Sequence, residues 1–286
     1  MRAEIKISVA LVTRNRPESL DRCLKSLRKQ SVQPFEVIVS DDSDSNLALA
    51  TELVARKWHC KYIRGLCQGL YVNRNHVVLT CSGTHVRTMD DDHEFPENHF
   101  EKCISSVQSD PSSVWIIGEY SPNQKVLDKP HPCPGQLHPR GFSVTPKDTQ
   151  NCWAISDGAS IYPIEMFKRG IKYTDSFKFG YAYLELGSRL HWLGYRVRHL
   201  DSTFVIHHFD VNNRSFMIKS VDLSSKFFAM LCHSFIYQTS VKNKFFSIME
   251  ICKKIIIHNF IGVYSLYKAL KVFRVQTKHS MSKKMS

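Results

Sequence analysis

Two apolar segments of this chain end in clusters of aspartate, and this pattern constrains the fold more than any other feature. Residues 84–89 predict a strand that runs into aspartates 90–92, and residues 35–39 predict one that runs into aspartates 41–42. Acidic runs are commonest in solvated turns. Two clusters at equivalent strand ends instead favour one shared pocket, because parallel strands of a doubly wound sheet deliver their carboxyl ends to one crevice. Close carboxylates repel one another, so a divalent cation is the expected partner.

Segments typical of strands and helices alternate over residues 1–118. In the first helical segment Leu20, Cys23, Leu24 and Leu27 recur at helical spacing, which predicts an apolar face after Pro17. The other helices are expected at residues 47–58, 70–79 and 96–107, and the strands at residues 5–12, 35–39, 61–63, 84–89 and 114–117. This alternation is typical of an α/β fold in which helices cover a parallel sheet.

The second part of the chain is less regular. Residues 119–150 carry six prolines and few apolar residues, which predicts a long irregular loop. Beyond it we expect a strand that ends at residues 161–162, helices at 163–169 and 181–193, and two short strands at 196–200 and 204–206. We therefore expect one domain over residues 1–213, with halves at 1–118 and 119–213, and a helical extension over residues 214–286.

The positive charge of the chain is concentrated in that extension. Residues 214–286 hold 13 Lys and Arg against two acidic residues, or +11 of the net +13, so the rest of the chain is nearly neutral. This distribution gives no indication of a nucleic-acid partner. Phenylalanine and isoleucine alternate with lysine in the extension, as in helices that lie on an anionic membrane. A helical lid that packs on the domain with its lysines in water is the alternative.

The lack of a predicted signal peptide and the pattern of cysteines favour a cytoplasmic protein. Peripheral attachment to the cytoplasmic face of a membrane is compatible with this location. Lys6 interrupts the first apolar stretch, so no signal peptide is predicted. No segment reaches the roughly 18 to 20 uncharged apolar residues of a membrane span. Nine cysteines without a CxxC pair fit reduced thiols. His131, Cys133 and His138 match no familiar zinc spacing and are expected to be ordinary loop residues.

With these motifs in order, residues 5–210 resemble the inverting nucleotide-sugar glycosyltransferases of family 2. The matching segments are residues 12–15, 39–43, 73–75, 90–96, 157–159, 185–190 and 207–208. The resemblance implies the GT-A fold, a doubly wound, Rossmann-like mixed sheet flanked by helices. It also implies a divalent metal, Mn²⁺ or Mg²⁺, that neutralises the departing diphosphate.

The resemblance assigns the metal site to the second aspartate cluster and a late histidine. Asp92 and Asp90 belong to the metal set, with Asp90 facing the ribose and Asp91 joining the nucleotide site. His207 or His208 completes the site, and an imidazole ligand would favour Mn²⁺. A histidine pair at a strand edge, without a ligand, is the alternative.

The resemblance also implies a nucleotide pocket. Asp41 or Asp42 would accept a hydrogen bond from the base or ribose, Thr13 and Arg14 would line the base pocket, and Arg74 would reach the base or the phosphates. Both arginines could equally be surface charges.

The general base is the point at which the chain departs from the family. The usual Glu-Asp pair falls on residues 182–183, which are Ala and Tyr when the helix is aligned through Arg189. Glu185 is then the first candidate base, since a carboxylate must take the proton of the acceptor hydroxyl. A surface ion pair between Glu185 and Arg189 is the alternative. Asp157 is the second candidate, and its alternative is an Asx turn.

These residues predict a metal-dependent inverting glycosyltransferase with a UDP-sugar as donor and a glycan or lipid-linked glycan as acceptor, in cell-surface polysaccharide or glycolipid synthesis. The missing Glu-Asp pair leaves open a degenerate, non-catalytic nucleotide-sugar binding protein. Sugar-phosphate nucleotidylyltransferases share the sheet and the acidic metal site. Residues 13–17 contain no glycine, however, and therefore lack the phosphate loop of that class.

Overall fold

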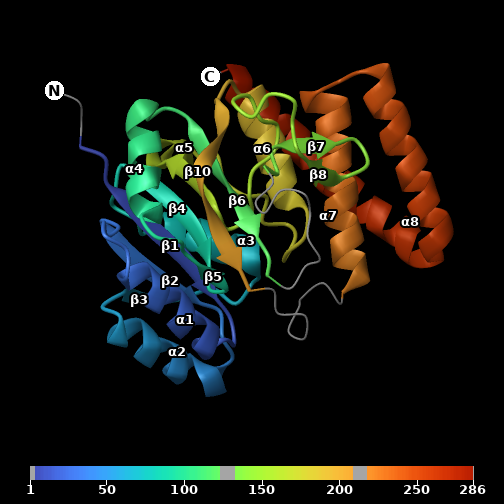
Figure 1. Ribbon diagram of the computed structural model, residues 1–286. Helices are drawn as coiled ribbons and strands as arrows, with labels where there is room; N and C mark the ends of the chain where they lie inside the picture. Colours follow the sequence, from blue (N-terminus) through green and yellow to red (C-terminus); the bar gives the residue numbers. More distant parts are fainter. Residues whose placement is uncertain (1–3, 123–132, 209–217, 286) are drawn as a thin grey trace. The chain divides into compact units, whose positions relative to one another are not determined.

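The computed structural model describes residues 4–122, 133–208 and 218–285. The chain divides into two compact units (Figure 1). The first unit comprises residues 1–133, 156–172 and 198–212, and the second comprises residues 134–155, 173–197 and 213–286. The domain limits predicted from the sequence, at 118 and 213, stay a prediction.

An eight-stranded mixed sheet forms the first unit, in the order β3-β2-β1-β4-β9-β6-β10-β5 (Figure 1). The parallel strands are β1 (Ile7–Thr13), β2 (Glu36–Asp41), β3 (Lys61–Arg64) and β4 (His85–Asp90). Strand β9 (Ser160–Pro163) lies antiparallel to both β4 and β6 (Val114–Tyr120). Strand β10 (Val197–His207) pairs antiparallel with the short β5 (His93–Glu94).

Five helices accompany the sheet in the described part of the first unit: α1 (Pro17–Arg28), α2 (Ser45–Lys57), α3 (Leu70–Val78), α4 (His99–Ser109) and α5 (Ile164–Lys168). Helices α1 and α2 lie side by side (Figure 1). The apolar face predicted for α1 is fully buried in one core with Leu11, Met89 and Phe100. The core holds the carboxyl ends of the parallel strands in place.

The second unit is built mainly of helices. It contains the hairpin of β7 (Gln136–His138) and β8 (Phe142–Val144), helix α6 (Ala182–Trp192), helix α7 (Lys219–Cys232) and a π-helical turn, η2 (His233–Tyr237). Helix α8 (Val241–Met285) ends the chain and packs on α7. Asn259 has φ +46° and divides α8 into two helices at a kink.

Two expectations from the sequence were wrong. Residues 196–200 and 204–206 belong to one strand, β10, because the polar Asp201 and Ser202 between them are exposed and leave the ladder unbroken. Residues 119–150 are not structureless throughout, since they include the β7–β8 hairpin, whose turn contains Gly141 at φ +75°. Residues 123–132 of that segment, His131 included, lie outside the described residues.

No helix within residues 4–122, 133–208 and 218–285 is long and apolar enough to span a membrane.

Candidate active site

The register of the parallel strands brings the two aspartate clusters to neighbouring strand ends, as the sequence predicts. Thr13 pairs with Asp41 across β1 and β2, and Val12 pairs with Asp90 across β1 and β4. Strand β1 therefore lies between the clusters, and both follow the carboxyl ends of strands at one edge of the sheet.

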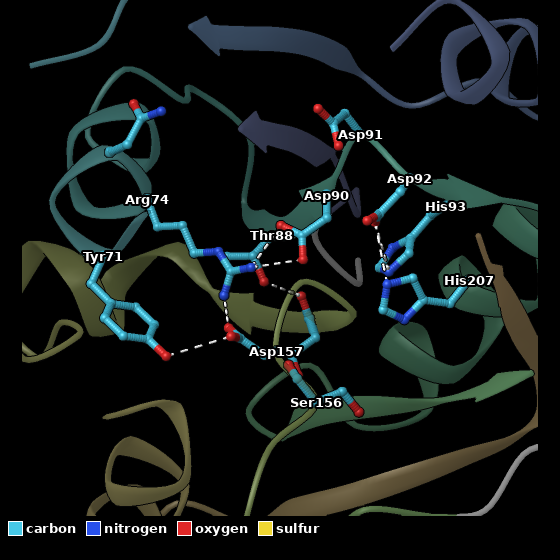
Figure 2. Close-up of polar contacts among 12 residues, drawn as sticks. Tyr71, Arg74, Thr88, Asp90, Asp91, Asp92, His93, Ser156, Asp157 and His207 are labelled. Atoms are coloured by element: carbon cyan, nitrogen blue, oxygen red, sulfur yellow. Dashed lines mark hydrogen bonds and ion pairs between the residues drawn. The ribbon is translucent and has the colours of Figure 1, made fainter. Parts of the chain in front are cut away.

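Asp92, His93 and His207 form a compact group of possible metal ligands (Figure 2). Asp92 Oδ1 lies 4.0 Å from His93 Nε2 and 3.5 Å from His207 Nε2, and one donor atom from each of the three residues lies within 4.8 Å of the others. His93 is fully buried, and neither of its ring nitrogens has a hydrogen-bond partner among the described residues. A buried imidazole without a partner is costly, and a cation at this point would satisfy it, so the residues fit a divalent metal.

Electrostatics at this group favour a cation. Burial alone would raise the pKa of Asp92, but the contact with His207 and the neighbouring positive charges hold it below its usual range. Burial opposes the charged form of His207, yet its contacts with Asp92 and Glu119 raise its pKa to about 10. His207 Nδ1 lies 2.9 Å from Glu119 Oε2. The two carboxylates therefore stabilise positive charge between them.

Asp90 belongs to a different cluster, with Arg74 and Asp157 (Figure 2). The fully buried Arg74 donates from Nη2 to both oxygens of Asp90, at 2.6 and 2.9 Å, and its Nη1 pairs with Asp157. The hydroxyl of Tyr71 lies 3.5 Å from Asp157 Oδ2. Arg74 is therefore no surface charge, and it fixes the orientation of two carboxylates.

Gly158 lets the chain pass close to Asp90. It has φ +72°, and a Cβ added at this position would lie 2.2 Å from Asp90 Oδ2. We expect Gly158→Ala to displace the Asp90 carboxylate and to lower the free energy of unfolding by about 1 to 3 kcal/mol. Gly194→Ala is the matched control, because Gly194 has φ +93° and an added Cβ would meet no atom within 4 Å.

Thermal melting and nucleotide affinity, measured on both glycine variants, check this expectation. Both variants should lose stability through backbone strain. Only Gly158→Ala should also lose nucleotide affinity, and equal affinities in the two variants would contradict a role for Asp90 in binding.

The Asp91 side chain points away from the Asp92–His93–His207 group and from the Arg74–Asp90–Asp157 cluster (Figure 2). Residues that precede α1 hold it in place. Its carboxylate accepts a hydrogen bond of 2.5 Å from the Thr13 hydroxyl and pairs with Arg16. Arg16 Nη1 also lies 3.0 Å from Asp92 Oδ2. Arg16 was not predicted as a site residue, whereas Arg14 was. Arg14 is exposed and pairs with Asp44 at 3.5 Å.

Asp41 and Asp42, the aspartate cluster at the end of β2, also accept several hydrogen bonds. Asp41 is buried and accepts hydrogen bonds from the Tyr62 hydroxyl at 2.9 Å, Arg64 Nη1 at 2.8 Å and the backbone of Ser43 at 2.8 Å. Asp42 accepts a hydrogen bond of 3.0 Å from the backbone of Cys67, and burial raises its pKa.

His208, the other predicted histidine ligand, lies outside the metal group. Its Nε2 is 2.7 Å from Glu94 Oε2. The possible metal ligand that was not predicted from the sequence is His93. Its signal was present, because it directly follows the aspartate cluster.

Glu185 lies in the second unit and is fully buried there. Oε1 accepts a hydrogen bond of 2.7 Å from the Tyr237 hydroxyl, and Oε2 accepts one of 3.1 Å from the Thr174 hydroxyl and one of 3.3 Å from Arg189 Nη2. Arg189 Nε forms an ion pair with Oε1 at 3.1 Å. The ion pair with Arg189 is thus present, but the expectation that it lies on the surface was wrong. It is buried because η2 brings Tyr237 onto α6.

The sequence matches the profile of a known protein family. The profile described as Glycosyl transferase family 2 matches residues 8–171, which is more than half of the chain. The chain belongs to glycosyl transferase family 2. The matched range contains both aspartate clusters, Arg74 and Asp157.

Two curated relatives of this family-2 member align with parts of it. The uncharacterized glycosyltransferase YwdF of Bacillus subtilis (strain 168) is 28% identical over 105 residues, which are 37% of this chain and 39% of the relative. The GalNAc(5)-diNAcBac-PP-undecaprenol beta-1,3-glucosyltransferase of Campylobacter jejuni subsp. jejuni is 34% identical over 93 residues, 31% of this chain and 30% of the relative. The alignments thus span less than half the length of each relative.

Solved structures confirm the GT-A fold. S. aureus TarS 1-349 in complex with UDP superposes with a TM-score of 0.59 at 16% identity, covering 88% of this chain and 72% of TarS 1-349. GalNAc-T7 with UDP, GalNAc and Mn²⁺ superposes with a TM-score of 0.66 at 15% identity, covering 91% of this chain and 59% of GalNAc-T7. At such identities the likeness shows the fold alone.

Proposed function

We propose that the chain is a metal-dependent inverting glycosyltransferase that moves a sugar from a UDP-sugar to an acceptor hydroxyl. The observation that carries the proposal is the group of Asp92, His93 and His207 beside the bonded carboxylate of Asp90, at the carboxyl edge of the sheet. Two structural neighbours, TarS 1-349 with UDP and GalNAc-T7 with UDP, GalNAc and Mn²⁺, support a nucleotide donor and a metal.

Asp92, His93 and His207 are the residues that would hold the metal. When bound, the cation neutralises the charge that develops on the diphosphate as the glycosidic bond breaks. Two imidazole nitrogens favour Mn²⁺ over Mg²⁺, which prefers oxygen ligands. In this proposal Arg16 and Asp91 hold the loop that carries Asp92, because their side chains pair with each other.

The nucleoside is assigned to the remaining residues at this edge of the sheet. Asp90, oriented by Arg74, would face the ribose, and Asp42 would accept a hydrogen bond from the base or ribose. Asp41 keeps the loop after β2 in place through its contacts with Arg64 and Ser43. A carboxylate held by a buried arginine is preorganised, so little orientational freedom is lost when the donor binds.

Asp157 is the general base in this proposal. Its side chain is 24% exposed, which leaves an oxygen within reach of an acceptor, and Arg74 fixes its direction. The acceptor hydroxyl gives its proton to the carboxylate while its oxygen attacks the anomeric carbon and the diphosphate leaves from the opposite face. Glu185 is the weaker candidate, because its side chain is fully buried, whereas that of Asp157 is partly exposed.

The acceptor is assigned to the class of glycans or lipid-linked glycans, in the synthesis of cell-surface polysaccharide or glycolipid. The Campylobacter relative supports this class, because it is named a GalNAc(5)-diNAcBac-PP-undecaprenol beta-1,3-glucosyltransferase. The alignment covers 30% of that relative, so the acceptor is part of the proposal and not of the comparison.

A release assay tests the proposed reaction. The purified chain is incubated with a panel of UDP-sugars, with Mn²⁺ or with a chelator, and free UDP is measured. We expect release with at least one donor in Mn²⁺ and none with the chelator, and NMR of the transferred sugar should show inversion at the anomeric carbon. Tight UDP binding without release from any donor would favour the second candidate function, a non-catalytic nucleotide-sugar binder. The hydrogen bond from Tyr237 to the buried Glu185 favours this second candidate, because it leaves Glu185 less able to act as a base.

His93 provides a separate test of the ligand set. Because His93 is buried and makes no hydrogen bond among the described residues, His93→Ala should weaken Mn²⁺ binding by on the order of 10- to 100-fold. Calorimetry with Mn²⁺ alone measures this without any turnover. His208→Ala is the control and should leave the affinity unchanged, since His208 contacts Glu94 instead. A loss in both variants, or in His208→Ala alone, would contradict the assignment.

A further inference from the structure

Helix α8 turns apolar side chains outward along its first part, before the kink at Asn259. Five of these exposed residues recur at a spacing that places them on one face of the helix: Val241, Phe245, Ile248, Met249 and Ile256. Ile257 is exposed beside this face. Ile256 is 76% exposed. A helix that only covers a core would bury this stripe.

The second part of α8 repeats the pattern after the kink. Its exposed large apolar residues are Phe260, Ile261, Val263, Tyr264, Tyr267, Val275 and Met281, and Phe260 is 80% exposed. The rings of Phe260 and Tyr264 stack with centroids 6.4 Å apart. Lys268 lies over the Tyr264 ring at 4.7 Å, so a cation accompanies the aromatic residues on the same surface.

The inward side of α8 carries small and polar residues together with apolar ones. Ser247, Ser265, Ala269, Gln276 and Ser280 are buried, and so is Ile251. Ser247 Oγ donates a hydrogen bond of 2.8 Å to the carbonyl of Pro139, and Ser265 Oγ donates one of 3.3 Å to the carbonyl of Ser220. The inward side therefore makes the contacts of α8 within its unit, while the apolar side chains of the outward side remain exposed.

Charge indicates what these exposed side chains contact. The exposed cations of α8 among the described residues are Lys242, Lys244, Lys253, Lys268, Lys271, Arg274, Lys278 and Lys284. The one acidic residue in the sequence of α8 is Glu250, whose side chain is largely buried and lies 3.8 Å from Lys254 and 4.0 Å from Lys226. The outward face thus combines apolar side chains with cations and has no carboxylate.

We propose that the exposed apolar side chains of the two parts of α8, with the lysines beside them, bind the surface of an anionic lipid membrane. Lysines are attracted to such a surface, and apolar side chains at the interface add to the affinity. A second copy of the chain is a poorer occupant, because two such faces carry the same charge. The proposal rests on α8 and is independent of the transfer reaction.

Vesicle co-sedimentation of the full chain tests the proposal. We expect binding to vesicles of phosphatidylcholine with phosphatidylglycerol and at least about tenfold less binding to phosphatidylcholine alone. The binding should weaken as salt rises from about 0.15 to 1 M, because the screening length falls from about 8 to 3 Å. Equal binding to neutral and anionic vesicles would overturn the proposal. A dimer seen by sedimentation velocity without lipid, combined with no vesicle binding, would favour a second copy instead.

A pair of double variants assigns any binding to α8. Ile256→Ser with Phe260→Ser should reduce vesicle binding by about tenfold or more, since each substitution removes an exposed apolar side chain that would be buried at the lipid interface. Leu49→Ser with Leu53→Ser is the matched control, because these leucines of α2 are 66% and 58% exposed. Equal melting temperatures and UDP affinities in both variants would confirm intact folding. Equal vesicle binding in both variants would overturn the assignment.

Discussion

Replacing Asp92 with alanine is expected to abolish metal-dependent nucleotide binding and to leave the protein folded. Asp92 is the carboxylate of the proposed ligand set, and its oxygen lies 3.5 Å from His207 and 4.0 Å from His93. Removing it also relieves repulsion with the neighbouring aspartates, which offsets part of the lost contacts. Loss of one charged ligand should weaken UDP binding in Mn²⁺, and transfer with it, by on the order of 10² to 10³-fold.

Nucleotide affinity and melting temperature, measured together, check the expected result for Asp92. Asp44→Ala is the control, because it removes the same charge from an exposed position where Asp44 pairs with Arg14. Unchanged affinity of Asp92→Ala in Mn²⁺ would exclude Asp92 from the metal site. A large drop in melting temperature would show instead that the cluster stabilises the fold.

The second large effect is expected at Asp157. Asp157→Asn keeps the shape of the side chain but can no longer accept the proton of the acceptor, so transfer should fall by about two to four orders of magnitude. UDP affinity should change by only a few fold, because Asp157 is not assigned to the nucleotide. Single-turnover rates with saturating donor separate these two quantities.

Glu185→Gln is the matched comparison, since it makes the same carboxylate-to-amide change in the second unit. We expect transfer close to normal but a free energy of unfolding lower by roughly 1 to 3 kcal/mol, because the buried Arg189 loses its charged partner. The reverse pattern, with transfer lost in Glu185→Gln and retained in Asp157→Asn, would return the base to Glu185.

The sequence predicts those parts of the fold that depend on local pattern. The helix at α1 follows from the spacing of its leucines, and the strand ends follow from apolar runs that stop at aspartates. The proximity of the two clusters follows as well, because parallel strands share an orientation. These features need no knowledge of distant pairing.

His93 shows what local pattern leaves out. It belongs to a strand of two residues, and its place beside His207 depends on the pairing of β5 with β10, in which His207 lies opposite His93. His93 and His207 are more than 100 positions apart in the sequence. A strand of two residues is too short to show a periodicity from which it could be predicted. His207 and His208 are adjacent in the sequence, and only this register separates their surroundings.

Arg14 and Arg16 illustrate the same limit at short range. Asn15 between them has φ +57°, a left-handed conformation that the sequence alone does not specify. Arg16 then reaches the second aspartate cluster, while Arg14 extends to Asp44. Similarly, the burial of Glu185 depends on a contact with Tyr237, which lies in a π-helical turn far along the chain.

In the proposed function, UDP binding depends on a metal held by Asp92, His93 and His207. Calorimetric titration of the full chain with UDP, in Mn²⁺ and in metal-free buffer, tests it most directly. We expect UDP to bind at least about tenfold more tightly in Mn²⁺, a difference of roughly 1.4 kcal/mol or more. Equal affinity for UDP in the two buffers would contradict this dependence on the metal.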